Sequence, residues 1–278
     1  MEYEILPLVK MTEQDFTKFS QFIYTNYGIN MTTAKKVMLE SRLQKRLHVL
    51  QITSFKSYFD LIISIKGQSE LLQMIDVVST NKTDFFREPV HFDFLIDQIL
   101  PSFKIKKTIR IWSAGCSSGE EPYSIAMVIS EFNLKNAPLD YHITCSDISM
   151  TMLHKAKDAI YSYDRIAVIP LDLKSKYFLK SKDAKNPSVR IIPELRKKVD
   201  FQRINFMDEN FTQIIGFFDV IFCRNVIIYF DRKTQEQVIN KLCRKLNKGG
   251  ILFLGHSESI TDFSVPLEQI KPTIFRKI

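Results

Sequence analysis

The chain has 278 residues, of which 45% are hydrophobic and 12% aromatic, so it can bury a sizeable core in one large domain or two modest ones. Its formal net charge of +8 favours an acidic partner such as nucleic acid, an anionic membrane surface or an acidic protein, although surface lysines kept for solubility give the same excess. The longest apolar runs, 220–223 and 226–230, fall far short of the roughly 20 residues that span a bilayer, which excludes a membrane helix.

Two further features predict a cytoplasmic protein with reduced thiols. Acidic residues at positions 2 and 4 stand where a secretory signal would carry positive charge. The four cysteines are widely spaced, with no CxxC pair and no Cys/His cluster at metal-ligand spacing. We therefore expect no disulfide framework and no metal site.

The first 75 or so residues are predicted to be helical. Apolar residues recur there at helical spacing, first at Phe16, Phe19, Phe22 and Ile23 and then at Leu39, Leu43, Leu47 and Leu50. Beside the leucines, Lys35, Arg42 and Arg46 fall within one narrow stripe of the same helical projection. Such a stripe is either a solvated helix surface or a docking face, and the spacing alone does not choose between them.

From residue 109 the pattern changes to short apolar runs separated by helical stretches. The runs are IRIWSA, YHITCS, FFDVIFC, GILFLG and TIFRKI. This alternation predicts a parallel sheet flanked by helices. Between about residues 165 and 200 the alternation pauses around the polar stretch KSKDAKNPS, which predicts a small antiparallel excursion inserted in the larger domain.

The strongest local signal is the stretch IRIWSAGCSSGEEPYSIAMVI, in which a strand runs into a Gly/Ser turn and then a helix. Gly115 and Gly119 allow the backbone to approach a ligand closely, near the unpaired N–H groups of the helix start. The spacing is neither the dinucleotide fingerprint nor a phosphate-binding P-loop. Glu120 and Glu121 would repel a pyrophosphate but could accept a hydrogen bond from an ammonium group, such as that of S-adenosylmethionine. Alternatively, they merely satisfy the helix dipole.

Further polar residues are predicted at strand ends. Asp147 follows the second strand, where an acidic residue of a Rossmann-like sheet binds ribose hydroxyls, with capping of the next helix as the alternative. Arg224 and Asn225 follow another strand, at the edge where open α/β sheets bind ligands. Because burial without partners would be costly for both, they should contact a ligand or each other.

Taken together, the motifs NKTDFFRE, SAGCSSGEEPYSIA, SDIS, FCRNVIIYFD and GHSES resemble, in order and spacing, the chemotaxis receptor methyltransferase (CheR) family over nearly the whole chain. The resemblance implies an α/β fold, with a Rossmann-like S-adenosylmethionine-dependent methyltransferase domain at residues 76–278 and a small inserted antiparallel β-subdomain at about 165–200. An N-terminal helical receptor-docking domain at residues 1–75 would precede it. The implied reaction moves methyl from S-adenosylmethionine to receptor glutamate side chains, giving 5-O-methyl esters and S-adenosylhomocysteine.

The resemblance also implies residue roles. Cofactor contacts are expected from Asn81, Thr83, Arg87, one of Glu120 and Glu121, Asp147, Asn205, Phe206, Arg224 and Asn225. Asn205 and Phe206 would meet the adenine, whereas without the family they would be read as a strand-end amide and a core ring. Arg87 would orient the carboxylate or the cofactor, and Tyr229 would line the substrate pocket. Because a glutamate is ionised at pH 7, neither residue need accept a proton.

The implied partners are the cytoplasmic domains of methyl-accepting chemotaxis receptors, whose acidic helices would dock on Lys35, Arg42 and Arg46. In some family members the inserted subdomain binds a receptor C-terminal peptide, but the turn SKDAKNPS lacks the glycines of those members. A nucleic-acid methyltransferase would share the fold, but its characteristic motifs are replaced here by CRNV. A non-enzymatic module with a decayed cofactor site is disfavoured because every required polar position is filled. We expect a monomer without a nucleic-acid partner or membrane insertion.

Overall fold

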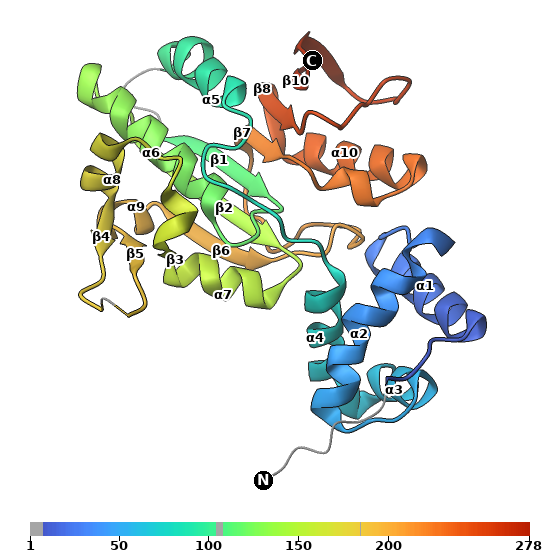
Figure 1. The fold of residues 1–278 in the computed structure, drawn as a ribbon. Helices are drawn as coiled ribbons and strands as arrows, with labels where there is room; N and C mark the ends of the chain where they lie inside the picture. Colours follow the sequence, from blue (N-terminus) through green and yellow to red (C-terminus); the bar gives the residue numbers. More distant parts are fainter. Residues whose placement is uncertain (1–7, 104–107, 184) are drawn as a thin grey trace.

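The computed structural model describes residues 8–103, 108–183 and 185–278. Figure 1 shows a small helical domain, coloured blue to teal, beside a larger α/β domain, coloured green to red. The acidic start of the chain lies outside the described residues. No helix in these described ranges is long and apolar enough to cross a membrane.

Among its described residues, the helical domain contains four α-helices: α1 (Glu13–Tyr27), α2 (Lys36–Leu50), α3 (Phe55–Ile62) and α4 (Gln68–Val78). Helix α1 begins with a capping box, in which Thr12 and Asp15 accept each other's backbone N–H groups. It ends at Gly28, whose φ of 71° lies in the left-handed region. The predicted helical residues form a separate core, with Phe19, Leu39 and Leu43 fully buried. The helical prediction is confirmed, and α4 continues past residue 75 to Val78.

The α/β domain alternates strands and helices along the chain. Its α-helices are α5 (Val90–Phe94), α6 (Glu120–Lys135), α7 (Met150–Asp158), α8 (Leu171–Tyr177), α9 (Pro193–Arg196) and α10 (Arg232–Lys245). The strands of its large sheet are β1 (Ile109–Ala114), β2 (Tyr141–Asp147), β6 (Val199–Arg203), β7 (Phe218–Cys223), β8 (Leu246–Leu254), β9 (Leu267–Lys271) and β10 (Ile274–Lys277).

The large sheet is mixed, with strand order β6-β2-β1-β7-β8-β10-β9. Its first five strands run parallel, as the sequence predicts, but β10 is antiparallel to both of its neighbours. The expectation of a parallel sheet is therefore wrong at this edge. Only Pro272 and Thr273 separate β9 from β10, and so short a connection reverses the chain instead of crossing over the sheet.

Both faces of the large sheet are covered, so its side chains alternate between two cores. Along β7, Val220 and Phe222 pack in the core that contains α6, whereas Ile221 and Cys223 pack in the core under α10. The four cysteines are buried free thiols. With both faces closed, the carboxyl edge of the parallel strands is where ligand access remains.

The predicted antiparallel excursion is confirmed as a separate three-stranded sheet. It is formed by β3 (Ile160–Ser162), β4 (Phe178–Lys180) and β5 (Ser188–Ile191), in the order β3-β5-β4. Both pairings are antiparallel. The sheet begins before residue 165 because β3 belongs to it, and it packs in the same core as α6.

Candidate functional site

A pocket lies between the helical domain and the carboxyl edge of the large sheet. Its sheet wall is formed by Gly115, Ser117, Glu121, Asp147, Ile148, Ile204, Asn205, Phe206, Arg224, Asn225, Val226, Tyr229 and Phe230. Its helical wall is formed by Tyr27, Ile29, Met31, Lys35 and Met38. Residues 79–88, here called the strap, join the two domains and line the pocket with Ser79, Thr80, Asn81, Lys82, Thr83 and Arg87.

The Gly/Ser turn after β1 approaches the opposite part of the sheet wall closely. Gly115 has φ of 91°, and a Cβ there would lie 2.3 Å from Cγ2 of Val226. Gly119, with φ of 96°, precedes α6, where a Cβ would lie 2.9 Å from that of Ala156. Both glycines are therefore required by backbone conformation and by space.

Asp147 holds this turn in place. Its carboxylate accepts the N–H of Ser117 at 2.8 Å and the N–H of Ser149 at 2.9 Å. The N-cap of α7 is Ser149, so Asp147 is not the capping residue that the sequence left as an alternative. Burial raises the pKa of Asp147, and the backbone hydrogen bonds oppose that rise. The carboxylate also faces the pocket, with lone pairs left for a ligand.

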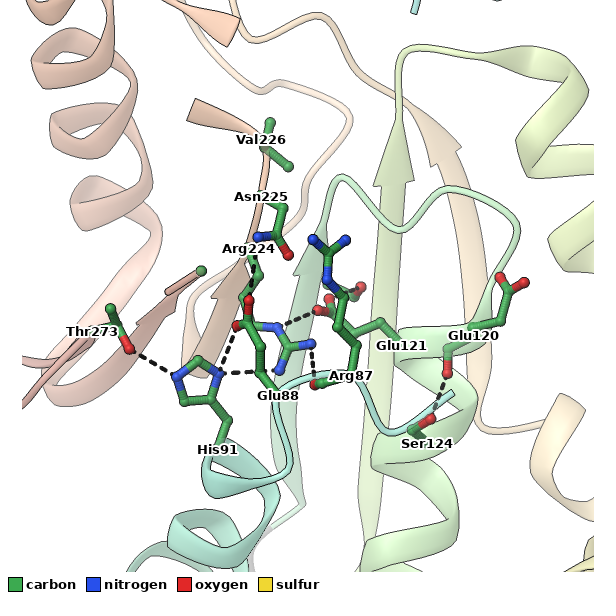
Figure 2. Close-up of polar contacts among 12 residues, drawn as sticks. Arg87, Glu88, His91, Glu120, Glu121, Ser124, Arg224, Asn225, Val226 and Thr273 are labelled. Carbon is green, nitrogen blue, oxygen red and sulfur yellow. Dashed lines mark hydrogen bonds and ion pairs between the residues drawn. The ribbon is translucent and has the colours of Figure 1, made fainter. Parts of the chain in front are cut away.

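The centre of the sheet wall is a buried charge network. Arg224 is 6% exposed, its Nε lies 2.9 Å from a Glu121 carboxylate oxygen, and its Nη2 donates to the carbonyl of Arg87 at 2.6 Å. Glu121 also accepts the hydroxyl of Ser113 at 2.6 Å. Figure 2 shows Arg224 between Glu121 and His91. Pairing these opposite charges offsets part of the free-energy cost of removing each of them from water.

His91 anchors this network from the opposite side of Arg224. Arg224 Nη1 lies 3.1 Å from His91 Nδ1, and because a guanidinium can only donate, Nδ1 must accept. The proton of the neutral ring is then on Nε2, which donates to the hydroxyl of Thr273 at 2.9 Å. Burial, reinforced by the charge of Arg224, lowers the pKa of His91 from 6.5 to about 4.

Glu120 lies outside this pocket lining, in contrast to its neighbour. It is 1% exposed, and its carboxylate pairs with Arg165 at 2.6 Å and accepts the hydroxyl of Ser118 at 2.7 Å. Consecutive residues of a helix point about 100° apart, so only one of the two glutamates faces the pocket. The structure thus separates their roles: Glu121 faces the ligand site, and Glu120 ties α6 to the inserted segment.

The strap is fixed along its length by donors from different elements. Ser117 donates to the carbonyl of Asn81, Arg165 to that of Thr83, and Arg224 to that of Arg87. The hydroxyl of Ser124 accepts the N–H of Phe86 at 2.9 Å. The side chain of Arg87 donates to the carbonyl of Lys82 at 3.0 Å. Because its backbone groups are used in this way, the strap holds one shape across the pocket.

Unusual backbone conformations cluster around the pocket. Phe86, Glu88, Ser117 and Asn225 all have φ between 49° and 59°, in the left-handed region. Each non-glycine residue there costs on the order of 1 kcal/mol, which the surrounding hydrogen bonds must offset. Such strain concentrates where a ligand site needs a particular backbone shape.

The two domains are joined beside the pocket by a few polar contacts. The amide of Asn205 donates to the carbonyl of Asn26 at 2.7 Å, and Asn30 N–H donates to the carbonyl of Tyr229 at 2.8 Å. Tyr24 donates its hydroxyl to Asp231, the N-cap of α10. Asn205 thus lines the pocket, but its NH₂ group is used between the domains, so the expected adenine contact would need another donor or the second proton.

The predicted basic stripe is engaged within the helical domain. Arg46 pairs bidentately with the buried Glu70, at 2.8 and 2.6 Å, and Tyr58 donates to the same carboxylate at 2.8 Å. Arg42 donates to the carbonyls of residues 78 and 79, where the strap begins. Lys35 donates to the carbonyl of Asn30 at 2.9 Å and lines the pocket. Of these three cations, Lys35 lines the pocket, whereas Arg42 and Arg46 do not.

One group of side chains has the spacing of a metal site. Ligand atoms of Glu88, His91 and His256 lie within 4.8 Å of one another. The Nδ1 lone pair of His91, however, accepts from Arg224, and that guanidinium would repel a cation bound beside it. The group is better described as part of the hydrogen-bond network around Arg224.

The residues that line the pocket suit a nucleoside that carries both a positive and a negative group. Glu121 and Asp147 offer carboxylates for an ammonium group and for hydroxyls, while Arg87 offers a guanidinium for a carboxylate. Ile148, Ile204 and Phe206 give an apolar surface for a base. The structure brings together all the predicted cofactor residues except Glu120, and Tyr229 lies with them.

Several residues that shape the pocket carry no signal that single-sequence reasoning can use. Arg165, His91 and Thr273 each lie far along the chain from the residue that they contact, which is Asp84 for Arg165, Arg224 for His91 and His91 for Thr273. Glu258 is different, because it lies in the motif GHSES. Its carboxylate accepts backbone N–H groups from residues 225–228.

Two family models match the chain. The model described as CheR methyltransferase, SAM binding domain, matches residues 81–275, and the model described as CheR methyltransferase, all-alpha domain, matches residues 14–79. The chain is similar to a chemotaxis protein methyltransferase of Borreliella burgdorferi, with 41% identity over 276 residues that cover 97% of this chain and 96% of the relative. It is also similar to the chemotaxis protein methyltransferase of Escherichia coli, with 36% identity over 260 residues covering 91% and 89%.

Proposed function

Because this chain belongs to the CheR methyltransferase family and is an S-adenosylmethionine-dependent methyltransferase, we propose that it methylates glutamate side chains of chemotaxis receptors to form 5-O-methyl esters. The substrates would be the cytoplasmic domains of methyl-accepting receptors. The observation that carries this proposal is the set of cationic side chains in the pocket lining, which includes Lys35, Lys82 and Arg87. Such a lining attracts an ionised carboxylate.

The reaction needs positioning more than proton transfer. When bound, S-adenosylmethionine supplies a methyl group on a sulfonium centre. The glutamate carboxylate is ionised at neutral pH, so its oxygen could attack the methyl group without a general base. The new O–CH₃ bond would replace the S–CH₃ bond, whose electron pair would stay on the sulfur of the departing S-adenosylhomocysteine. The protein's task is to hold the two reactants in line and to exclude water, which can contribute on the order of 7 kcal/mol or more.

The two residues predicted to be catalytic, Arg87 and Tyr229, both line the pocket. Arg87 lies in the strap and lines the pocket, and its donation to Lys82 leaves guanidinium N–H groups for a substrate or cofactor carboxylate. Tyr229 lines the pocket from the turn after β7, and its carbonyl accepts the N–H of Asn30. We propose that Arg87 orients the carboxylate and that Tyr229 forms the surface against which the substrate side chain lies.

The helical domain would receive the receptor. Since Lys35 lines the pocket and Arg42 and Arg46 do not, we propose that Lys35 carries most of the electrostatic contact with an acidic receptor helix. Lys35 lies in the helical wall, so a helix that meets it would present its own side chains to the pocket.

The direct test is transfer of labelled methyl from S-adenosylmethionine to a receptor cytoplasmic fragment, followed by mild alkali. Methyl esters release volatile methanol under these conditions, whereas N-methyl products keep the label. We expect alkali-labile label with the wild-type protein and about 100-fold less with Asp147→Asn, which removes the charge that we assign to ribose binding.

Two results would contradict the proposal. Alkali-stable label would show a product other than a methyl ester, such as an N-methyl group. Absence of transfer to fragments of several receptor classes, with cofactor bound, would exclude receptors as substrates. A glutamine-for-glutamate receptor fragment is the matched control, because it retains the fold of the substrate and lacks the carboxylate nucleophile.

A further inference from the structure

Glu258 lies in the loop after β8, outside the pocket lining, and its carboxylate organises the backbone behind the sheet wall. One oxygen accepts the N–H groups of Val226 and Ile227, both at 2.8 Å, and that of Ile228 at 3.4 Å. The other accepts the N–H of Asn225 at 2.9 Å and that of Gly255 at 2.5 Å. Five backbone donors therefore converge on a carboxylate that is 5% exposed.

The turn held by these bonds carries the pocket residues. It follows β7 at Cys223 and includes Asn225, Val226 and Tyr229, which all line the pocket. Asn225 has φ of 59°, a left-handed conformation that most side chains disfavour. Successive N–H groups that point to one side form a concave anion site, and an anion there stabilises the strained conformation. Figure 2 shows Asn225 and Val226 directly above Arg224, at the end of β7.

The turn is also held from its other side. The amide of Asn225 donates to Glu88 at 3.3 Å, and the N–H of His256 donates to the same oxygen at 3.2 Å. A Cβ at Gly255 would lie 2.5 Å from Nδ2 of Asn225, so this glycine allows β8 to approach. The strap, the turn after β7 and the loop after β8 thus meet at Asn225, and Glu258 supplies the charge at this junction.

We propose that Glu258 is a positioning residue: its ionised carboxylate sets the backbone of residues 225–228 so that Arg224, Asn225 and Tyr229 face the cofactor and the substrate. The neutral isostere glutamine cannot replace it. Its amide keeps one accepting oxygen, but its NH₂ group would face backbone N–H groups that also donate. Burial raises the pKa of Glu258, while the N–H groups that it accepts oppose that rise.

The test compares Glu258→Gln with Asp219→Asn, using S-adenosylhomocysteine as the probe in isothermal titration calorimetry. Asp219 is 7% exposed, lies near the opposite end of β7, accepts the N–H of Arg110 at 3.0 Å and does not line the pocket. Both variants remove one buried charge from the same region of the sheet. We expect the Kd of Glu258→Gln to rise at least about tenfold with unchanged stoichiometry, and that of Asp219→Asn to stay within about twofold of wild type.

Stoichiometry separates positioning from a simple loss of folding. A merely structural role would lower the fraction of protein that binds and leave the Kd of the folded fraction unchanged. Glu258→Asp, which keeps the charge on a side chain shorter by one methylene, should bind with an intermediate Kd, and it decides the matter if Glu258→Gln does not fold. A wild-type Kd for Glu258→Asp and Glu258→Gln, or equal weakening in Asp219→Asn, would overturn the proposal.

The catalytic part of this inference rests on the proposed function, whereas the binding part does not. In the methyl-transfer assay at saturating cofactor, we expect kcat for Glu258→Gln to fall about 100-fold, because Tyr229 and Arg224 move with the turn. If the wild-type protein transferred no methyl to receptors while Glu258→Gln still weakened cofactor binding, the proposed function would fail and the positioning role would stand. A normal kcat at full saturation would contradict the catalytic part.

Discussion

The two walls of the pocket are built from different interactions. The sheet wall contains three buried charged side chains, Glu121, Asp147 and Arg224, each with two or more polar partners. In the helical wall, Lys35 is the charged residue among aromatic and aliphatic side chains. The helical wall belongs to a domain with its own core and meets the sheet wall through few polar contacts.

This difference indicates that the two walls serve different ligands. A wall of interlocked charges has one arrangement, because any displacement leaves a buried group without its partner. It suits a cofactor whose polar groups are always the same. A wall of apolar groups on a separately folded domain can shift by small amounts at low cost, which suits protein substrates whose surfaces differ. The following predictions test whether the sheet wall is as tightly coupled, and the helical wall as separable, as this comparison implies.

The largest loss of stability is expected from Arg224→Met, which leaves the buried carboxylate of Glu121 without its cationic partner. Breaking a buried pair from one side costs about 3–5 kcal/mol of unfolding free energy. Urea denaturation would measure the loss. The double variant with Glu121→Gln should recover part of it, since neither charge then remains, and purely additive losses would show that the two residues are not coupled.

A slightly smaller loss of stability is expected from Gly28→Ala, at the contact between the two domains. A Cβ on Gly28 would lie 2.6 Å from Sδ of Met207 in the α/β domain, and φ there is 71°. Gly249→Ala is the matched control, because φ is 75° and no atom lies within 4 Å of its Cβ position. We expect Gly249→Ala to cost about 1 kcal/mol and Gly28→Ala about 1–3 kcal/mol more.

Cofactor affinity in Gly28→Ala tests how separable the helical wall is. Measured by calorimetry with S-adenosylhomocysteine, we expect a Kd within about fivefold of wild type, because the sheet wall keeps its own network. A Kd raised by about 100-fold would contradict the comparison between the walls.

The pH dependence of stability should report the buried state of His91. Its pKa falls from 6.5 to about 4 on folding, so the unfolded chain binds more protons between these values. The contribution of His91 to the free energy of unfolding is fully present above pH 6.5 and is lost as the pH falls toward 4. Between pH 7 and pH 5 the loss is about 2 kcal/mol. His91→Asn keeps an acceptor for Arg224 without titrating, so its unfolding free energy should fall less over this range. If the unfolding free energies of wild type and His91→Asn fell equally with pH, the pKa of His91 would not be lowered by folding.

The sequence predicts the elements that local periodicity and strand order determine. Phe19 and Leu43 are buried because their helices are amphipathic, and Asp147 and Asn225 lie at the pocket because the carboxyl ends of parallel strands share an edge. The direction of β10 was not predictable in this way, since TIFRKI has the same alternation in either orientation.

Other features depend on partners far away in the sequence. Which of two adjacent glutamates faces the pocket depends on the rotation of α6 about its axis, which the packing of Tyr123 and Ile125 in the core fixes. The stripe residue Arg46 is held by Glu70 on α4, which helical spacing within α2 cannot reveal. Long-range hydrogen bonds thus decide the details of the site, while short-range patterns decide the elements that carry it.

The smallest effect concerns the cation of the helical wall. Lys35→Ala removes an ammonium group from the pocket rim, whereas the control Lys66→Ala removes an exposed one that does not line the pocket. We expect the KM for a receptor fragment to rise about three- to fivefold with Lys35→Ala at low salt and to be unchanged with Lys66→Ala. The difference should shrink at 0.5 M salt, because screening weakens exposed charge contacts. Unchanged kcat would assign Lys35 to substrate capture, whereas a fall in kcat with constant KM would place it in the reaction and make the helical wall part of the catalytic machinery.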